Sequence, residues 1–104
     1  MTRPDTPAAS DPAASREEQG RAISRLLGLL ETEDALDPRV MEARAELAEA
    51  TARTGEYEDA VKQADELLKD AQREHGPEHP ATLRARAAVD LILDLAGLAG
   101  LGRA

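Results

Sequence analysis

The sequence predicts an all-α fold built from antiparallel helical hairpins, with about four helices in all. Three observations lead to this prediction. Charged residues make up 33% of the 104 residues and hydrophobic residues 41%, with alanine the commonest, whereas aromatic residues make up only 1%. No run of β-branched residues alternates with polar ones, which is the pattern of a half-buried strand. Four segments carry helix-start and helix-stop residues around apolar side chains at helical spacing.

The first helix is expected over residues 15–32. Ser15 is followed three residues later by Glu18, the pattern of a capping box. The apolar stripe that follows has helical spacing and consists of Ala22, Ile23, Leu26, Leu27 and Leu30. Residues 1–14 contain three prolines among Ala, Ser, Thr and Asp, so we expect a disordered arm there.

The second helix is expected over residues 38–54. Asp37 and Pro38 form an N-cap followed by proline at the first helical position, where the missing N–H does no harm. Its inner side is marked by Val40, Met41, Leu47, Ala48 and Thr51. Gly55 follows the helix at a position that favours a left-handed residue.

The third and fourth helices are expected over residues 57–75 and 80–96. The third has the most regular stripe, which consists of Tyr57, Ala60, Val61, Ala64, Leu67, Leu68 and Ala71. The fourth begins at His79-Pro80, the same cap-plus-proline pattern as Asp37-Pro38, and its expected stripe is Leu83, Ala87, Leu91 and Leu95. Residues 98–104 form a glycine-containing tail after this domain of residues 15–97.

An internal repeat underlies these helices. Pro38 and Pro80 are 42 residues apart, and the same shift places Leu47 on Val89 and Gly55 on Gly97. Shifted back by the same interval, the third helix aligns with the first. The chain therefore reads as one complete helical hairpin with half a hairpin on each side.

The repeat resembles the tetratricopeptide repeat (TPR) family in its long, kinesin-light-chain-like subtype. The residues that carry the resemblance are Leu47, Ala48, Gly55, Tyr57, Ala60, His79 and Pro80, within the motifs GEYEDA and GPEHPATL. The resemblance implies an α-solenoid fragment in which Tyr57 fills the space between the paired helices. It also implies that Ala48 and Ala60 lie where two helices cross closely.

A solenoid of this kind is usually stable only with about three repeats, because each unit leaves apolar faces uncovered. This chain has about two. We therefore expect a second subunit or another protein to cover its last helix, through an association face of Leu91, Ile92, Leu95 and Leu98. The alternative is a buried last helix that frays through its glycines.

The resemblance also implies a groove along the first helix of each hairpin. Its expected residues are Glu42, Glu49, Arg53, Arg84 and Leu91, together with Ala45, Ala52, Ala87 and Asp94. Repeats of the subtype often carry an asparagine pair that holds a peptide backbone, but this chain has Ala45-Glu46 and Ala87-Ala88 instead. The alternative is that these residues only solvate the surface.

Composition argues against several functions. The formal charge of −8 repels a phosphate backbone, so no nucleic-acid partner is expected. There is no cysteine, and Gly76-Pro77 interrupts the helix between His75 and His79, so neither a metal nor another cofactor is expected. The apolar run from Leu91 is too short for a membrane span. No pair of carboxylates is set in an apolar cleft, so we expect no enzyme.

We therefore expect a small, acidic, cytoplasmic protein–protein interaction module, a homo-oligomer or one completed by a protein or peptide partner. The alternative is a small dimeric helical regulator that binds one dedicated enzyme or transcription factor. The bias toward Ala, Arg and Glu suggests a bacterial source with a GC-rich genome. The starting Met and the arm favour a complete chain.

Overall fold

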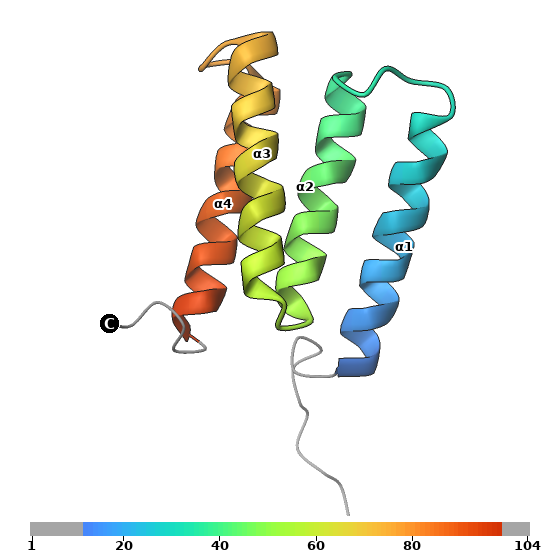
Figure 1. Ribbon diagram of the computed structural model, residues 1–104, viewed down its shortest axis with the longest axis vertical. Helices are drawn as coiled ribbons and strands as arrows, with labels where there is room; N and C mark the ends of the chain where they lie inside the picture. Colours follow the sequence, from blue (N-terminus) through green and yellow to red (C-terminus); the bar gives the residue numbers. More distant parts are fainter. Residues whose placement is uncertain (1–11, 99–104) are drawn as a thin grey trace, which may run out of the picture.

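The computed structural model describes residues 12–98, which form four α-helices and no strand. The helices are α1 (Pro12–Leu30), α2 (Pro38–Arg53), α3 (Tyr57–His75) and α4 (Pro80–Leu98) (Figure 1). The all-α prediction is confirmed. Most of the expected arm and the last six residues of the expected tail lie outside the described residues.

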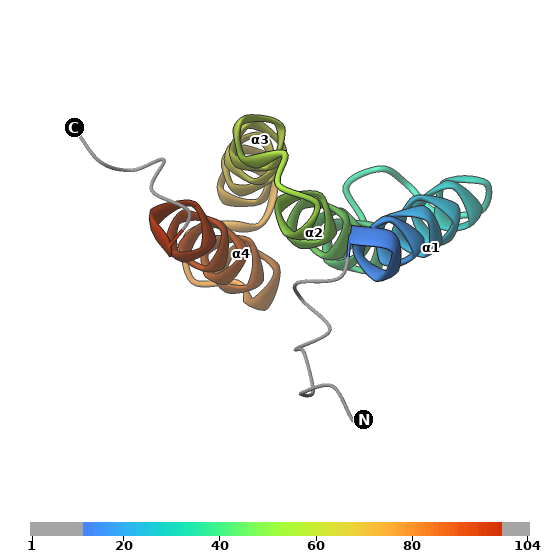
Figure 2. The same cartoon turned by 90° about the horizontal axis from the view of Figure 1, so that it is seen from below.

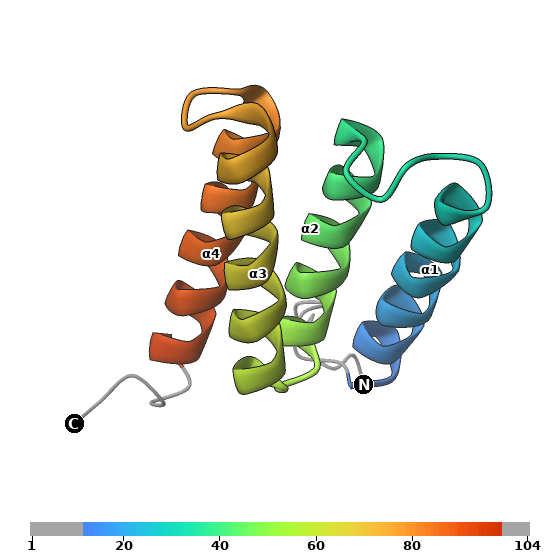
Figure 3. The same ribbon diagram turned by 45° about the horizontal axis from the view of Figure 1, so that its top comes forward.

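Consecutive helices run antiparallel, and they stand side by side with α1 at one end (Figure 3). α2 packs against each of the other three helices, whereas α1 packs extensively only against α2. Seen along the helix axes, α3 and α4 form a pair on one side of α2, and α1 lies on the other side (Figure 2). α2 is therefore the central element of the fold.

The start of α1 differs from the prediction. The helix begins at Pro12, and Ser15 lies inside it and is only 3% exposed. The expected capping box of Ser15 and Glu18 is therefore wrong. Proline suits the first helical turn because its missing N–H has no partner there in any helix, so α1 starts three residues earlier.

The starts of α2 and α4 confirm the two cap-plus-proline predictions. Asp37 accepts a hydrogen bond on Oδ1 from the backbone N–H of Arg39 at 2.8 Å. His79 accepts one on Nδ1 from the backbone N–H of Ala81 at 2.9 Å. In both caps, the side chain thus accepts from the backbone N–H of the residue two positions later. Gly55 has a φ of 93°, as its expected left-handed turn requires.

The core consists mainly of alanine. One cluster of buried residues combines Met41, Ala45, Leu67, Ala71, Ala81, Ala85 and Ala88. The other combines Ala48, Ala52, Ala60, Ala64 and Ile92, with Tyr57, Val61, Val89 and Leu95 packed against it. Ala48 and Ala60 are fully buried between the helices, as expected for close crossings. Tyr57 and Leu47 are only half-buried.

The buried face of α4 differs from the expected stripe. Leu83 is 51% exposed and Ala87 is exposed, while the buried residues are Ala81, Thr82, Ala85, Ala88, Ile92 and Ala96. Small side chains on the contact face let α4 approach α2 and α3 closely, which leaves the larger leucines outside. The stripe of α1 divides in the same way: Ala22 and Leu26 are half-buried, whereas Ile23, Leu27 and Leu30 are exposed.

The orientation of α4 about its own axis, which differs from the expected one, also corrects the expected association face. Ile92 is fully buried in the core of the chain, so it cannot contact a second subunit. Leu95 packs against the same cluster, and Leu91 is half-buried. Leu98 is 85% exposed, and Leu93, which the prediction did not include, is 53% exposed.

Candidate functional site

One face of α2 is lined by charged side chains. Glu42, Glu46, Glu49 and Arg53 follow one another at intervals of three or four residues, which places them on one side of the helix. α4 borders this face on one side and α1 on the other. The face contains three of the five groove residues predicted from the sequence.

Arg84 of α4 joins this face through two carboxylates. Its Nε lies 3.0 Å from each carboxylate oxygen of Glu42, and its two terminal nitrogens lie 2.7 and 2.9 Å from those of Glu49. The hydrogen bonds to Glu49 are the largest cause that raises the pKa of Arg84 above its ordinary value, so the guanidinium stays charged. The structure thus brings the predicted residues Glu42, Glu49 and Arg84 together.

Replacing Arg84 by methionine is expected to lower the free energy of unfolding by about 1–2 kcal/mol, after allowance for solvent screening. The reason is that Glu49, whose side chain is only 13% exposed, would lose both of the hydrogen bonds that it accepts from Arg84. Urea denaturation followed by far-UV circular dichroism measures the loss. The control is Lys69→Met, which removes an exposed ion pair with Asp65 and should leave the midpoint unchanged; equal effects would contradict the prediction.

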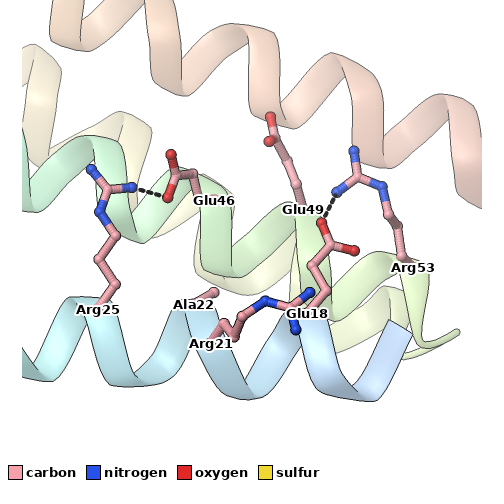
Figure 4. A pocket seen from close by; sticks show the side chains of 7 residues that line it. All are labelled: Glu18, Arg21, Ala22, Arg25, Glu46, Glu49 and Arg53. Carbon is pink, nitrogen blue, oxygen red and sulfur yellow. Dashed lines mark hydrogen bonds and ion pairs between the residues drawn. The ribbon is translucent and has the colours of Figure 1, made fainter. Parts of the chain in front are cut away.

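On the side of α1, the same face of α2 borders a cavity of about 330 Å³. Its lining residues are Glu18, Arg21, Ala22, Arg25, Glu46, Glu49 and Arg53 (Figure 4). Arg53 donates to Glu18 at 3.0 Å, and Arg25 donates to Glu46. The hydrogen bond to Glu46 is also the main cause that raises the pKa of Arg25. Arg21 lies between these two pairs (Figure 4).

The groove predicted from the sequence did not include α1, because it was placed only along the first helix of each hairpin, residues 38–54 and 80–96. The signal that was available is the spacing of Arg21 and Arg25, which puts both on one face of α1. The cavity holds three arginines and three glutamates, most of them already paired. A charged ligand would have to break these pairs, so the cavity is better suited to holding α1 on α2 than to binding.

A second groove lies between α3 and α4 and is mainly apolar. Its volume is about 690 Å³, and we name it the α3/α4 groove. Its lining residues are Tyr57, Glu58, Val61, Lys62, Asp65, Val89, Leu93 and Ala96. The α4 side is formed by residues 89, 93 and 96, at a spacing of four and three residues. This second apolar stripe of α4 is visible in the sequence, but the prediction used the stripe that contains Leu91 and Leu95.

The two histidines lie together at the turn between α3 and α4. Their rings stack with a centroid distance of 4.5 Å, although the sequence indicated that Gly76-Pro77 keeps them apart. His75 Nε2 lies 2.9 Å from the carbonyl oxygen of Leu36, and His79 caps α4. Both side chains thus have structural partners. Within residues 12–98 there is no group of three or more metal-ligating side chains.

None of the helices in the described part of the chain combines the length and the apolar character needed to cross a membrane. Comparisons of the chain with protein-family models, with curated proteins and with solved structures find no match. The TPR resemblance therefore stays a prediction from its motif residues.

Proposed function

We propose that this chain is a non-enzymatic protein–protein interaction module of TPR type, and that its partner docks in the α3/α4 groove. The observation that carries the proposal is the apolar character of this groove at the outer side of the last helix. Leu93 is 53% exposed there, beside Val89 and Ala96. Exposed apolar surface of this kind, bordered by charged residues, is typical of a protein interaction site.

The arrangement of the helices supports the repeat part of the proposal. α2 and α4 begin with the same cap geometry 42 residues apart, and each packs against α3. In a stack of helical hairpins each repeat packs on the next one, and in this chain α4 packs against both α2 and α3 and so covers the groove between them. At the α3/α4 groove the place of such a covering helix is not taken by any described residue, so a partner is expected to take it.

The charged face of α2 is a weaker candidate for the docking surface. Its glutamates are held by Arg25 and Arg84, and the pairs would have to be broken before they could bind a peptide. The α3/α4 groove requires no such exchange, because a partner with an apolar face would only displace water from it.

The test is a pulldown from the native host with three versions of the chain as bait. Leu93→Glu places a charge in the α3/α4 groove and is expected to lose the bound protein. Leu83→Glu is the matched control, since Leu83 is 51% exposed on the same helix but does not line the groove. A protein retained by the natural chain and by Leu83→Glu, but lost by Leu93→Glu, supports the proposal. Equal retention by all three contradicts it.

The same experiment separates the proposed module from the dedicated regulator. A regulator would retain a single protein in fixed stoichiometry, whereas a general interaction module would retain several. Quantification of the eluted chains relative to the bait gives this ratio.

A further inference from the structure

The α3/α4 groove has two short apolar walls. Val61 belongs to the α3 wall, and Val89 and Leu93 belong to the α4 wall. Ala96, the last lining residue of α4, is seven positions after Val89, which is about 10 Å along a helix axis, or about two helical turns. The groove can therefore hold about two turns of a helix that has apolar side chains on one side.

At the start of α3 the groove adjoins a smaller hollow that is acidic. This hollow has a volume of about 290 Å³ and is lined by Gly55, Glu56, Tyr57, Glu58 and Asp59. Tyr57 and Glu58 line the α3/α4 groove as well, so one surface passes from apolar to acidic over a short distance. We name the smaller space the acidic hollow.

The carboxylates of the acidic hollow are not paired with cations of the chain. Glu56 accepts a hydrogen bond from the hydroxyl of Thr54 at 2.6 Å. Within residues 12–98, no ion pair is made by Glu56, Glu58 or Asp59, and all three are exposed. The glutamates on the charged face of α2 differ, because arginines hold them. A basic side chain of a partner would therefore pair with the acidic hollow without displacing an arginine.

The net charge of the lining residues also favours a basic partner. The groove and the hollow together are lined by four acidic residues and one basic residue, a net charge of −3: Glu56, Glu58, Asp59, Asp65 and Lys62. Asp65 is paired with Lys69 at 2.9 Å, so the unpaired negative charge is concentrated at the hollow. A positive group at that end of a partner would be attracted, and a negative group would be repelled.

Backbone hydrogen bonding favours a helical partner segment. Both walls of the groove belong to helices, whose backbone groups are bonded within each helix, and residues 12–98 contain no strand whose edge an extended peptide could join. An extended peptide buried against the apolar walls would leave backbone groups of its own unpaired, which costs free energy. A helix pairs these groups internally and presents apolar side chains at intervals of three and four residues.

We propose that the partner segment at the α3/α4 groove is an amphipathic helix with a basic end. Its apolar side lies against Val61, Val89 and Leu93, and a lysine or arginine near one end lies in the acidic hollow. This inference rests on the proposed function and names the chemistry of its partner. It also gives a role to Glu58, which lines both spaces and pairs with the basic group of the partner.

The first experiment selects binding peptides from a library of random sequences about 15 residues long, enough for about four helical turns. The natural chain is the target, and the Leu93→Glu chain removes peptides that bind elsewhere. The retained peptides are expected to carry apolar residues at helical spacing and a lysine or arginine near one end. Retained peptides without an excess of basic residues, or no peptide that distinguishes the two chains, would overturn the inference.

The second experiment measures the affinity of a retained peptide by fluorescence anisotropy, with circular dichroism to show that each variant is folded. Glu58→Lys is expected to raise the Kd about tenfold or more, because it places a like charge beside the basic group. Glu66→Lys is the matched control, since Glu66 is exposed on the same helix but lines neither space. It lies about 12 Å from Glu58 along the helix axis, where salt screens exposed charges, so the Kd should change less than about threefold.

An exchange of charges separates ion pairing from a disturbed surface. A peptide whose basic residue is replaced by glutamate should bind the natural chain more weakly and regain affinity for the Glu58→Lys chain. If neither replacement changes the affinity, the acidic hollow is not part of the site and the inference is overturned. A loss of affinity that the exchanged pair does not recover would overturn it as well.

Failure of this inference can be told apart from failure of the proposed function when Glu58→Lys is added to the baits of the pulldown. A host protein that Glu58→Lys retains and Leu93→Glu loses would leave the interaction module standing and overturn the basic helix as its partner. Equal retention by the natural chain, Leu93→Glu and Glu58→Lys would overturn both.

Discussion

Replacing Ile92 by alanine is expected to lower the free energy of unfolding by about 2–5 kcal/mol. Ile92 is fully buried and is the largest aliphatic side chain of a cluster whose other buried members are alanines. Truncation would leave a cavity that alanine neighbours cannot fill, since they have no side-chain rotamers with which to collapse into it. Small domains have about 5–15 kcal/mol of stability, so this loss would be a large share of the total.

The adjacent residue supplies the control for this prediction. Leu93 follows Ile92 in the sequence but points away from the core and is 53% exposed. Leu93→Ala should change the unfolding free energy by less than about 0.5 kcal/mol. Both variants are measured by urea denaturation at a protein concentration low enough to keep the chains apart. Similar losses of unfolding free energy at the two positions would contradict the burial of Ile92 and the orientation of α4 about its axis.

Replacing Ala48 by leucine is expected to destabilise the fold by about 1–3 kcal/mol or more. Ala48 is fully buried on α2, where it contacts a cluster with residues from α3 and α4. Since α2 packs against all the other helices, the added side chain would push apart the centre of the fold rather than its edge. The effect is opposite in origin to that of Ile92→Ala, because here the site is overfilled.

The matched control is Ala87→Leu on the exposed side of α4. Alanine and leucine have similar helix propensities, so this control reports the effect of the leucine side chain on an exposed helix surface. It should leave the thermal unfolding midpoint nearly unchanged, while Ala48→Leu lowers it. An increase in the midpoint for Ala48→Leu would mean that the core holds unfilled space at this crossing.

The helices were predictable because their limits depend on local chemistry. Asp37, His79 and their prolines set the starts of α2 and α4 through contacts only two residues away in the sequence, and Gly55 sets a turn. The start of α1 was missed because Ser15 has the right chemistry for a cap but lies within a helix that Pro12 begins. Two valid helix-start signals competed there, and the sequence pattern does not rank them.

The orientation of each helix about its own axis was harder to predict. Periodicity analysis assigns the largest apolar residues to the core, and in α4 that favours Leu83 and Leu91 over alanine positions. The core contact is instead made mainly by small residues, because they let the helices pack closely. The surface that the helices bury by this close approach takes the place of the surface that large side chains would bury. In the candidate site, the residues joined by Arg84 were predicted from the sequence. The α3/α4 groove was not predicted, because it depends on the orientation of α4 about its axis.

The one-sided packing of α1 has a consequence for the cooperativity of the protein. Because α1 packs extensively only against α2, it can separate from the chain without disturbing the two alanine clusters, which involve only α2, α3 and α4. Its backbone amides should therefore exchange with solvent through a local opening of lower free energy than the opening of α2. α1 would then be the least protected helix of the chain.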